Sequence, residues 1–247
     1  MSSNVLAEDL GDILTDHIDS DVENVILVNP EKSSVASVVE TLHGRDDSPR
    51  VDLLATADFF KEVMADFYVA SRAADLVQQE LLSLAAVDEQ PTQSLLLTED
   101  DLTALVTVAG GIGGLYTDED HIVTAVSEHV GSIESMADPF ELQTPALSRV
   151  RETMGADLGE STVADFDAVL SRMARNGAQL RTLDEVTICL LVAARNGELL
   201  YDVSKWGEDV GIASKATFSR TKTRLEEAGV LDTEKVPIQV GRPRLRL

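Results

Sequence analysis

Cysteine is almost absent from this 247-residue chain, which contains one, Cys189. A single cysteine excludes an intramolecular disulfide and a zinc site built on several cysteines. Its apolar neighbours, residues 188–192, predict a buried, inert thiol rather than a nucleophile. The histidines lie far apart and without the spacing of metal ligands, so we expect no histidine metal site; they are His17, His43, His121 and His129.

Long apolar runs are also lacking. No stretch of about 20 apolar residues is present to span a bilayer, and the polar beginning of the chain does not resemble a signal peptide. We therefore expect a soluble, cytoplasmic protein with no membrane partner.

Basic residues are scarce: 20 Lys and Arg stand against 44 Asp and Glu, a formal net charge of -24. Negative charge of this size, spread along the chain, is tolerable where concentrated salt screens it, which predicts an extreme halophile. The first 148 residues hold five basic and 29 acidic residues, whereas from Lys205 onward nine are basic and six acidic. This local change of sign predicts a nucleic-acid partner for the C-terminal end.

Short apolar runs alternate with helical periods over residues 1–140. This order predicts an α/β domain with a mainly parallel sheet flanked by helices, in which the later strands pair antiparallel. The expected strands are 25–28, 51–55, 94–97, 102–108 and 115–116; the expected helices are 5–18, 33–42, a long or broken helix within 59–84, and 118–136.

A helical connector is expected over residues 141–180, with helices at 146–154 and 161–176. The second helix carries one apolar stripe, which can pack on the C-terminal domain or on a second subunit. We favour the second subunit and hence a homodimer. The stripe is formed by Val163, Phe166, Val169, Leu170 and Met173.

Residues 181–247 have the order of a winged helix-turn-helix: a helix at 183–194, a second short helix, a glycine turn, and a third helix from Ser214 to Ala228. On the third helix, Phe218 and Leu225 share the inward face with two smaller side chains, Thr221 and Ala228. The outward face would enter the major groove of double-stranded DNA. The alternative is an ordinary solvated surface. The outward residues are Ser214, Lys215, Thr217, Ser219, Arg220 and Arg224.

The predicted wing follows this helix. Val236, Ile238 and Val240 alternate on one strand, and the last residues place Arg242, Arg244 and Arg246 on one side of the next. Such an arginine row can enter the minor groove or clamp phosphate. Alternatively, the arginines pair with acidic neighbours.

Glycines at 110, 111, 113 and 114 invite comparison with a nucleotide-binding loop. The segment lacks the Lys-Ser/Thr pair of a phosphate loop, so we interpret it as a flexible turn between two strands. No nucleophile, base and acid set is evident, and no cofactor is expected.

Polar residues follow several expected strands of the N-terminal domain. In parallel sheets, ligands bind beyond the carboxyl ends of the strands, so a small-molecule effector would bind there. Ordinary turn and capping roles are the alternative for these residues: Asn29, Thr56, Asp58 and Thr98.

The segments 214–220, 225–231 and 241–244 resemble the winged-helix regulators of archaea, and the whole chain resembles the TbsP-type regulators of haloarchaea. The resemblance implies sequence-specific promoter binding in a circuit shared with the sugar-responsive TrmB-type regulators and touching central carbon metabolism. The N-terminal domain is also similar to the phospholipase-D-related effector domains of TrmB-type regulators. It lacks the His-x-Lys catalytic motif of true phospholipases, so this resemblance implies a non-enzymatic domain.

These observations lead to a first hypothesis: a non-enzymatic, DNA-binding transcription regulator whose N-terminal domain senses an effector or mediates dimerisation. An enzyme acting on a nucleotide or phosphoester is a second hypothesis. A winged helix used for protein contacts is a third, and it would predict an acidic or apolar recognition face.

Overall fold

The computed structural model describes residues 4–16, 18, 21–44, 48–108, 111–176, 183–237 and 243–247. The chain divides into two compact units, Met1–Leu142 (unit 1) and Gln143–Leu247 (unit 2), each with its own core. Within these ranges, no helix combines the length and the apolar character needed to cross a membrane.

Unit 1 is built on one mixed sheet, in which the described strands lie in the order β1-β7-β6-β5-β2-β3-β4-β8. The central strands are apolar and buried, because helices cover them. The strands are β1 (Val5–Ala7), β2 (Asn24–Val28), β3 (Arg50–Thr56), β4 (Leu82–Val87), β5 (Leu95–Leu97), β6 (Leu102–Val108), β7 (Gly111–Thr117) and β8 (Asp138–Pro139).

The α/β class is confirmed, but the prediction of a mainly parallel sheet was wrong. Among the described strand pairs, β2–β3 and β3–β4 are parallel and the other five are antiparallel. Parallel pairing needs a crossover connection, and helices supply one between β2 and β3 and between β3 and β4. The connections from β5 to β6 and from β6 to β7 are too short for a crossover, so these later strands pair antiparallel, as predicted.

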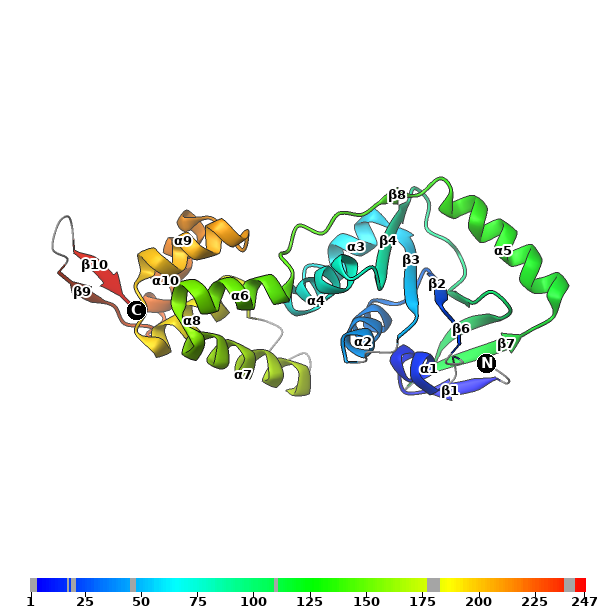
Figure 1. Cartoon of the computed structure of the whole chain (residues 1–247), viewed down its shortest axis with the longest axis horizontal. Helices are drawn as coiled ribbons and strands as arrows, with labels where there is room; N and C mark the ends of the chain where they lie inside the picture. Colours follow the sequence, from blue (N-terminus) through cyan, green and yellow to red (C-terminus); the bar gives the residue numbers. More distant parts are fainter. Residues whose placement is uncertain are drawn as a thin grey trace. The chain divides into compact units, whose positions relative to one another are not determined.

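Helices lie on both faces of this sheet. One face is covered by α5 (Asp120–Glu134), whose Val123 and Val130 enter a buried cluster with Val28 and Leu54 from the central strands. The other described helices of unit 1 lie on the opposite side (Figure 1). They are α1 (Leu10–Asp16), α2 (Lys32–His43), α3 (Ala57–Val63) and α4 (Phe67–Gln78).

Two expected helices of unit 1 are shorter than their apolar patterns indicated. Residues 5–7, assigned to a helix from the sequence, form the edge strand β1, and Leu6 pairs with Gly113 of β7. The region 59–84 ends its helices at Gln78, and Leu82 begins a strand parallel to β3. A segment that is apolar on all sides has no clear period, so helix and strand give the same pattern.

The glycine-rich segment is also different from the prediction. Gly111 to Gly114 lie within strand β7 rather than in a turn; residues 109–110 are outside the described part of the chain. A Cβ on Gly114 would lie 2.8 Å from Cγ1 of Val5 and 2.9 Å from Cγ2 of Thr103. The glycine is therefore needed for close packing of β1 and β6 on β7, not for phosphate binding.

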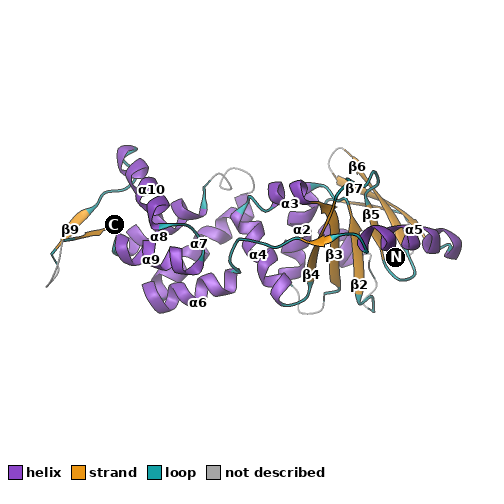
Figure 2. Ribbon diagram, turned by 90° about the horizontal axis from the view of Figure 1, so that it is seen from above, coloured by secondary structure: helices purple, strands orange, loops and turns teal. Residues whose placement is uncertain are grey.

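Unit 2 is helical, and its chain ends in a hairpin (Figure 2). Helix α6 packs on α7 and α9, and α7 packs on α8. Helix α6 continues through Gly155, where a break was expected, and ends at Gly159, whose φ is 94°. The elements are α6 (Leu147–Leu158), α7 (Glu160–Asn176), α8 (Glu185–Asn196), α9 (Leu200–Val210), α10 (Lys215–Glu227), β9 (Glu234–Val236) and β10 (Arg244–Arg246).

The apolar stripe of α7 faces the interior of unit 2. Phe166, Leu170 and Met173 are buried within this chain, while Val163 and Val169 are partly buried. The favoured assignment of this stripe to a second subunit was therefore wrong. The expected connector helices share a core with α8 and α9. The homodimer stays a prediction, but the stripe of α7 is not its interface.

Candidate nucleic-acid interface

Helices α9 and α10 are joined by a tight turn that positions the predicted DNA-contacting residues. Gly211 ends α9 with φ of 94°, a left-handed conformation that favours glycine. The amide of Ile212 donates a 2.8 Å hydrogen bond back to the carbonyl of Gly207. Gly207 has no side chain, and the ring of Phe218 occupies the space that a Cβ would need. The two helices are thereby fixed at close range.

Helix α10 has two faces, as its sequence predicts, except that Ala228, assigned to the inward face, is exposed because the helix ends at Glu227. Phe218 is fully buried, and Thr221 and Leu225 are buried with it against α8 and α9. The hydroxyl of Ser214 caps the helix by accepting a 3.2 Å hydrogen bond from the amide of Thr217. The predicted contact residues lie at or beside the solvent: Thr217 is half-buried, and Ser214, Lys215, Ser219, Arg220 and Arg224 are exposed.

Arg220 differs from the other cations of this surface. Its Nε donates to the carbonyl of Ala216 at 3.4 Å and its guanidinium to Oγ1 of Thr217 at 3.3 Å, both on its own helix. Among the residues that the structure describes, no carboxylate pairs with it. Arg220 is therefore a cation at the solvent face whose guanidinium can donate hydrogen bonds to an acceptor group from outside.

Lys215, at the start of α10, is paired with Glu208 near the end of α9. Its Nζ lies 2.9 Å from Oε2 of Glu208, and its backbone amide donates to Oε1 at 3.2 Å. The hydrogen bond from Lys215 lowers the pKa of Glu208, and the same bond raises the pKa of Lys215. Both side chains are charged at neutral pH.

Arg224, further along α10, is paired with Asp184. Its guanidinium donates to Oδ2 of Asp184 at 3.1 Å and to Oγ1 of Thr187 at 3.2 Å. Asp184 is also the N-cap of α8 and accepts a 2.7 Å bond from the amide of Thr187. Burial acts to raise the pKa of Asp184, but the hydrogen bonds from Thr187 and Arg224 together lower it.

The predicted wing arginines lie on β10, which pairs antiparallel with β9. Arg244 reaches back to α9: it donates to Oδ1 of Asp202 at 3.2 Å and lies 4.4 Å from the ring centre of Tyr201. Arg246 lies 3.8 Å from Glu234 of β9. Arg242, Ile238 and Val240 lie outside the described residues.

The last strand is also joined to the start of α9 by its backbone. Arg246 forms a bridge with Leu199, and the amide of Leu247 donates to the carbonyl of Glu198 at 2.9 Å. Arg244 thus contributes to attaching the hairpin to α9 as well as to the charge of this surface.

Both described arginines of the predicted wing, Arg244 and Arg246, pair with acidic neighbours, which is the alternative stated for the wing. Lys215 and Arg224 of α10 are also paired, so Arg220 is the exception among the described basic residues of the predicted interface. The acidic partners were not predicted from the sequence, because they are 7 to 42 residues away along the chain. They are Glu208, Asp184, Asp202 and Glu234.

The predicted effector residues of unit 1 do not form one group. Thr98 follows β5, which runs antiparallel to β2, so it lies at the opposite end of the sheet from Asn29. Thr56 caps α3, Asp58 pairs with Lys61, and Asn29 accepts a hydrogen bond from Gln90. These contacts are the turn and capping roles of the alternative interpretation. The expected pocket depended on a mainly parallel sheet, and that sheet is not observed.

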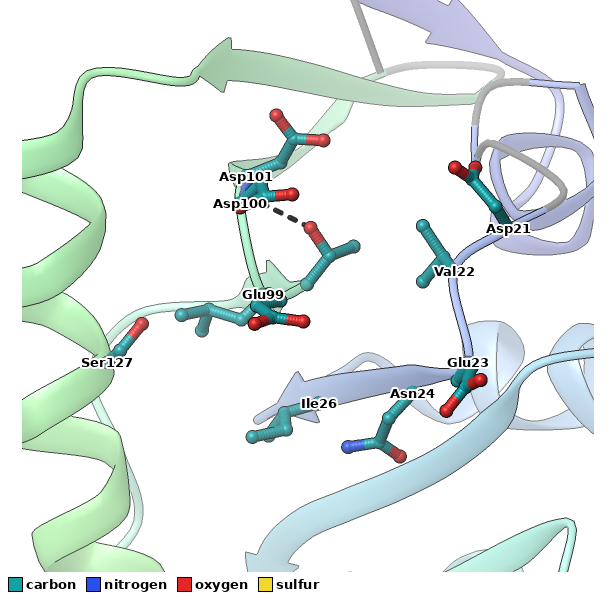
Figure 3. Close-up of a pocket in the computed structure, with 11 residues that line it drawn as sticks. Asp21, Val22, Glu23, Asn24, Ile26, Glu99, Asp100, Asp101 and Ser127 are labelled. Carbon is teal, nitrogen blue, oxygen red and sulfur yellow. Dashed lines mark hydrogen bonds between the residues drawn. The ribbon is translucent and has the colours of Figure 1, made fainter.

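A cavity of about 790 Å³ does occur at the Thr98 end of the sheet (Figure 3). Carboxylates surround it from the segment before β2 and from the turn between β5 and β6, and no lysine or arginine is among its described lining residues. Such a lining repels phosphate. In the described part of the chain, no three His, Cys, Asp or Glu side chains are placed to hold a metal ion. The carboxylates are Asp21, Glu23, Glu99, Asp100 and Asp101.

Cys189 is buried, as predicted, and its burial raises the pKa of the thiol, which keeps it protonated and unreactive.

Comparison with protein families covers nearly the whole chain. The N-terminal domain of TbsP-like transcriptional regulators matches residues 2–145. The C-terminal helix-turn-helix domain of the same regulators matches residues 146–247. The chain belongs to the TbsP-like family of transcriptional regulators. This TbsP-like membership identifies unit 2 as a helix-turn-helix domain and the chain as a DNA-binding regulator.

Other comparisons add little to the TbsP-like assignment. No curated protein matches the chain. Among solved structures, a similar chain is TrmBL2, described as an archaeal chromatin protein with a novel mode of DNA binding. The two chains are 11% identical with a TM-score of 0.37, and the match covers 56% of this chain and 54%, about half, of TrmBL2. At this level of similarity, nothing about this chain is inferred from TrmBL2.

Proposed function

We propose that this TbsP-like chain is a sequence-specific regulator that binds promoter DNA with the N-terminal half of α10 in the major groove. The observation that carries the proposal is Arg220, exposed at the solvent face and unpaired with any carboxylate among the described residues. Arginine is the side chain that most often reads guanine, through two hydrogen bonds to its major-groove edge. Short side chains at Ser214 and Ser219 leave room for the helix to approach the bases.

The hairpin of β9 and β10 is proposed to lie beside the same DNA, with Arg246 next to the DNA backbone. Arg242, which is outside the described residues, remains a DNA contact predicted from the sequence. Arg244 is proposed to hold the hairpin on α9 and to reach phosphate only by leaving Asp202. Phosphate contacts set the position of a protein on the duplex, whereas base contacts specify sequence.

The wider setting is proposed from the composition and the family resemblance. The acidic surplus suits the cytoplasm of a halophilic archaeon, and the resemblance favours genes of central carbon metabolism as targets. A homodimer would place two copies of α10 on half-sites about one helical turn apart. Unit 1 would then sense an effector or join the subunits.

An enzyme acting on a nucleotide or phosphoester is not favoured. The described residues that line the cavity of unit 1 include five carboxylates and no basic side chain, so a phosphorylated substrate would be repelled there. Protein contact as the main use of α10 is not favoured either, because its outward face is basic and hydroxylated rather than acidic or apolar.

The experiment uses the full chain and DNA fragments that it selects from a genomic library. Binding to the best fragment is measured by fluorescence anisotropy at a fixed KCl concentration. Arg220→Ala is expected to weaken binding by roughly 5- to 150-fold, the range for loss of one bidentate base contact. It should also reduce the preference for the selected fragment over a scrambled one.

The matched control is Arg149→Ala, which removes an exposed arginine from α6 of the same unit. It changes the net charge equally and should change affinity much less than Arg220→Ala. Equal affinities for the wild type and Arg220→Ala on the selected fragment would contradict the proposed role of α10.

A further inference from the structure

Three basic side chains of the proposed interface, Lys215, Arg224 and Arg246, already have negative partners before any DNA is bound. Glu208 lies 2.9 Å from Lys215, and Asp184 lies 3.1 Å from Arg224. Glu234 lies 3.8 Å from Arg246. A DNA phosphate that binds any of these three cations competes with a carboxylate of the protein for it.

These ion pairs are open to such competition. The side chains of Lys215 and Glu208 are 45% and 44% exposed, and those of Arg224 and Asp184 are 63% and 46% exposed. By contrast, Lys222 pairs with Glu226 at 2.7 Å with its side chain only 12% exposed. The Lys215–Glu208 and Arg224–Asp184 pairs are therefore accessible to a ligand, whereas the Lys222–Glu226 pair is part of the fold.

The carboxylates would remain in place after their cations moved to DNA. Glu208 also accepts the backbone amide of Lys215, at 3.2 Å. Asp184 also accepts the backbone amide of Thr187, at 2.7 Å. Because backbone amides hold them, both negative charges would stay at the surface and face the phosphates across the interface.

The effect differs for specific and non-specific DNA. Non-specific binding depends almost entirely on phosphate neutralisation, whereas specific binding also uses base contacts. A carboxylate that competes for Lys215 or Arg224 therefore weakens non-specific binding proportionally more. Arg220 has no such competitor in the described part of the chain.

We propose that Glu208, Asp184 and Glu234 are specificity-determining residues that compete with DNA phosphate for Lys215, Arg224 and Arg246 and thereby suppress non-specific binding. This inference rests on the proposed function, because it assumes that α10 and β10 face DNA. It adds that the DNA-binding surface carries its own counter-ions. Such a surface releases fewer mobile ions on binding, so its affinity falls less steeply with salt.

The test measures the affinity of the full chain for a scrambled duplex and for its selected fragment over a series of KCl concentrations. The variants are Glu208→Gln, Asp184→Asn, Glu234→Gln and the triple combination. Each single change is expected to raise affinity for the scrambled duplex by up to about fivefold, the size of one exposed ion pair. Each should also steepen the slope of log affinity against log salt by up to about 0.9. The ratio of specific to non-specific affinity should fall.

Asp209→Asn is the matched control. Asp209 lies beside Glu208 on α9 but pairs with Lys205, 3.1 Å away on the same helix. The Asp209→Asn substitution changes the net charge by the same amount as each single test variant, but it does not free a cation of α10 or β10. Asn at position 184 keeps the N-cap of α8, since asparagine caps as well as aspartate. Circular dichroism checks that every variant is folded.

A double-mutant cycle isolates the competition itself. The gain from Glu208→Gln should disappear when Lys215 is replaced by Gln, because the cation for which they compete is gone. An equal gain in both backgrounds would show a general charge effect and would overturn the assignment of Glu208.

The remaining outcomes separate this inference from the proposed function. If the wild type binds its selected fragment and the triple variant gains no more than Asp209→Asn, the inference fails and the proposed function stands. If neither protein binds any duplex, both fail. If only the triple variant binds the scrambled duplex, the inference is supported.

Discussion

Unit 1 and unit 2 carry charge in very different ways. Residues 1–142 contain 29 acidic and five basic residues, whereas residues 143–247 contain 15 of each. The whole formal net charge of -24 therefore belongs to unit 1. In unit 2 the charges balance, and most described cations around α10 have a carboxylate partner.

The difference shows that acidity and DNA binding are kept apart in this chain. An unbalanced negative surface on unit 2 would oppose a DNA backbone, while an unbalanced positive surface would bind any duplex. On the proposed interface, paired cations would avoid both effects. They leave unit 2 neutral overall, and they would still be available to DNA phosphate. The following predictions test whether the two units are also separate in their stability.

The largest effect is expected from Phe218, which is fully buried between α10 and α9. Phe218→Ala should lower the free energy of unfolding of unit 2 by about 3–5 kcal/mol, through lost burial and a cavity. The single tryptophan, Trp206, is buried in α9 and bonded to Thr153 of α6, so its fluorescence reports on unit 2 during urea unfolding.

Phe60→Ala is the matched change in unit 1, where Phe60 is equally buried. It should leave the Trp206 transition unchanged while lowering the stability seen by far-ultraviolet circular dichroism. A shift of the Trp206 transition as large as that of Phe218→Ala would show that the two units unfold together.

A second pair of changes compares two helical glycines. A Cβ at Gly207 would overlap the ring of Phe218, so Gly207→Ala should destabilise unit 2 by about 1–3 kcal/mol. At Gly131, in α5 of unit 1, nothing lies within 4 Å of the same position. Gly131→Ala should therefore stabilise unit 1 by about 0.5–1 kcal/mol, through better helix propensity. Thermal unfolding of both variants measures whether each change raises or lowers stability. A loss of stability at both sites would contradict the packing argument.

Features that depend on neighbours in sequence could be predicted well. The start of α10 at Ser214, its end near Gly229 and the inward position of Phe218 follow from capping residues and helical period. These features locate the candidate interface. They required no knowledge of distant residues.

Features that depend on distant residues could not be predicted in the same way. Strand β4 begins at Leu82 because β3 offers a parallel partner, although its sequence also suits a helix. The antiparallel course of β5 separates Thr98 from Asn29 and removes the expected effector pocket. Likewise, the pairing of Asp184 with Arg224 joins positions 40 residues apart, and no local pattern indicates it.

Ser214 allows stability and DNA binding to be separated on α10. Ser214→Ala removes the hydroxyl that accepts the hydrogen bond from the Thr217 amide and caps α10. The loss should lower the free energy of unfolding of unit 2 by about 1 kcal/mol. Ser214→Asp keeps a capping side chain, so stability should stay close to the wild type, but it places a negative charge at the proposed DNA surface. Urea unfolding and anisotropy are measured for both variants. Full stability with unchanged DNA affinity for Ser214→Asp would exclude the start of α10 from the interface.

The smallest effect is a pH dependence from Asp184. Its pKa is lowered in the folded chain, since bonds from Thr187 and Arg224 outweigh burial, so the ionised carboxylate stabilises unit 2. This contribution is complete above the unfolded pKa of about 4 and is lost as pH falls through the lower, folded pKa. Asp184→Asn keeps the cap but has no titrating group.

The wild type should therefore be more stable than Asp184→Asn by less than about 1 kcal/mol at pH 7, as for other partly exposed ion pairs, and the difference should be smaller at pH 3. Urea midpoints from Trp206 fluorescence at both pH values provide the measurement. Asp58 of unit 1 is the matched control: a hydrogen bond from Lys61 lowers its pKa, but Asp58→Asn should not move the Trp206 transition at either pH. If the stability difference between the wild type and Asp184→Asn grew as the pH fell, its sign would be wrong for a lowered pKa. That result would contradict a stabilising ion pair between Asp184 and Arg224.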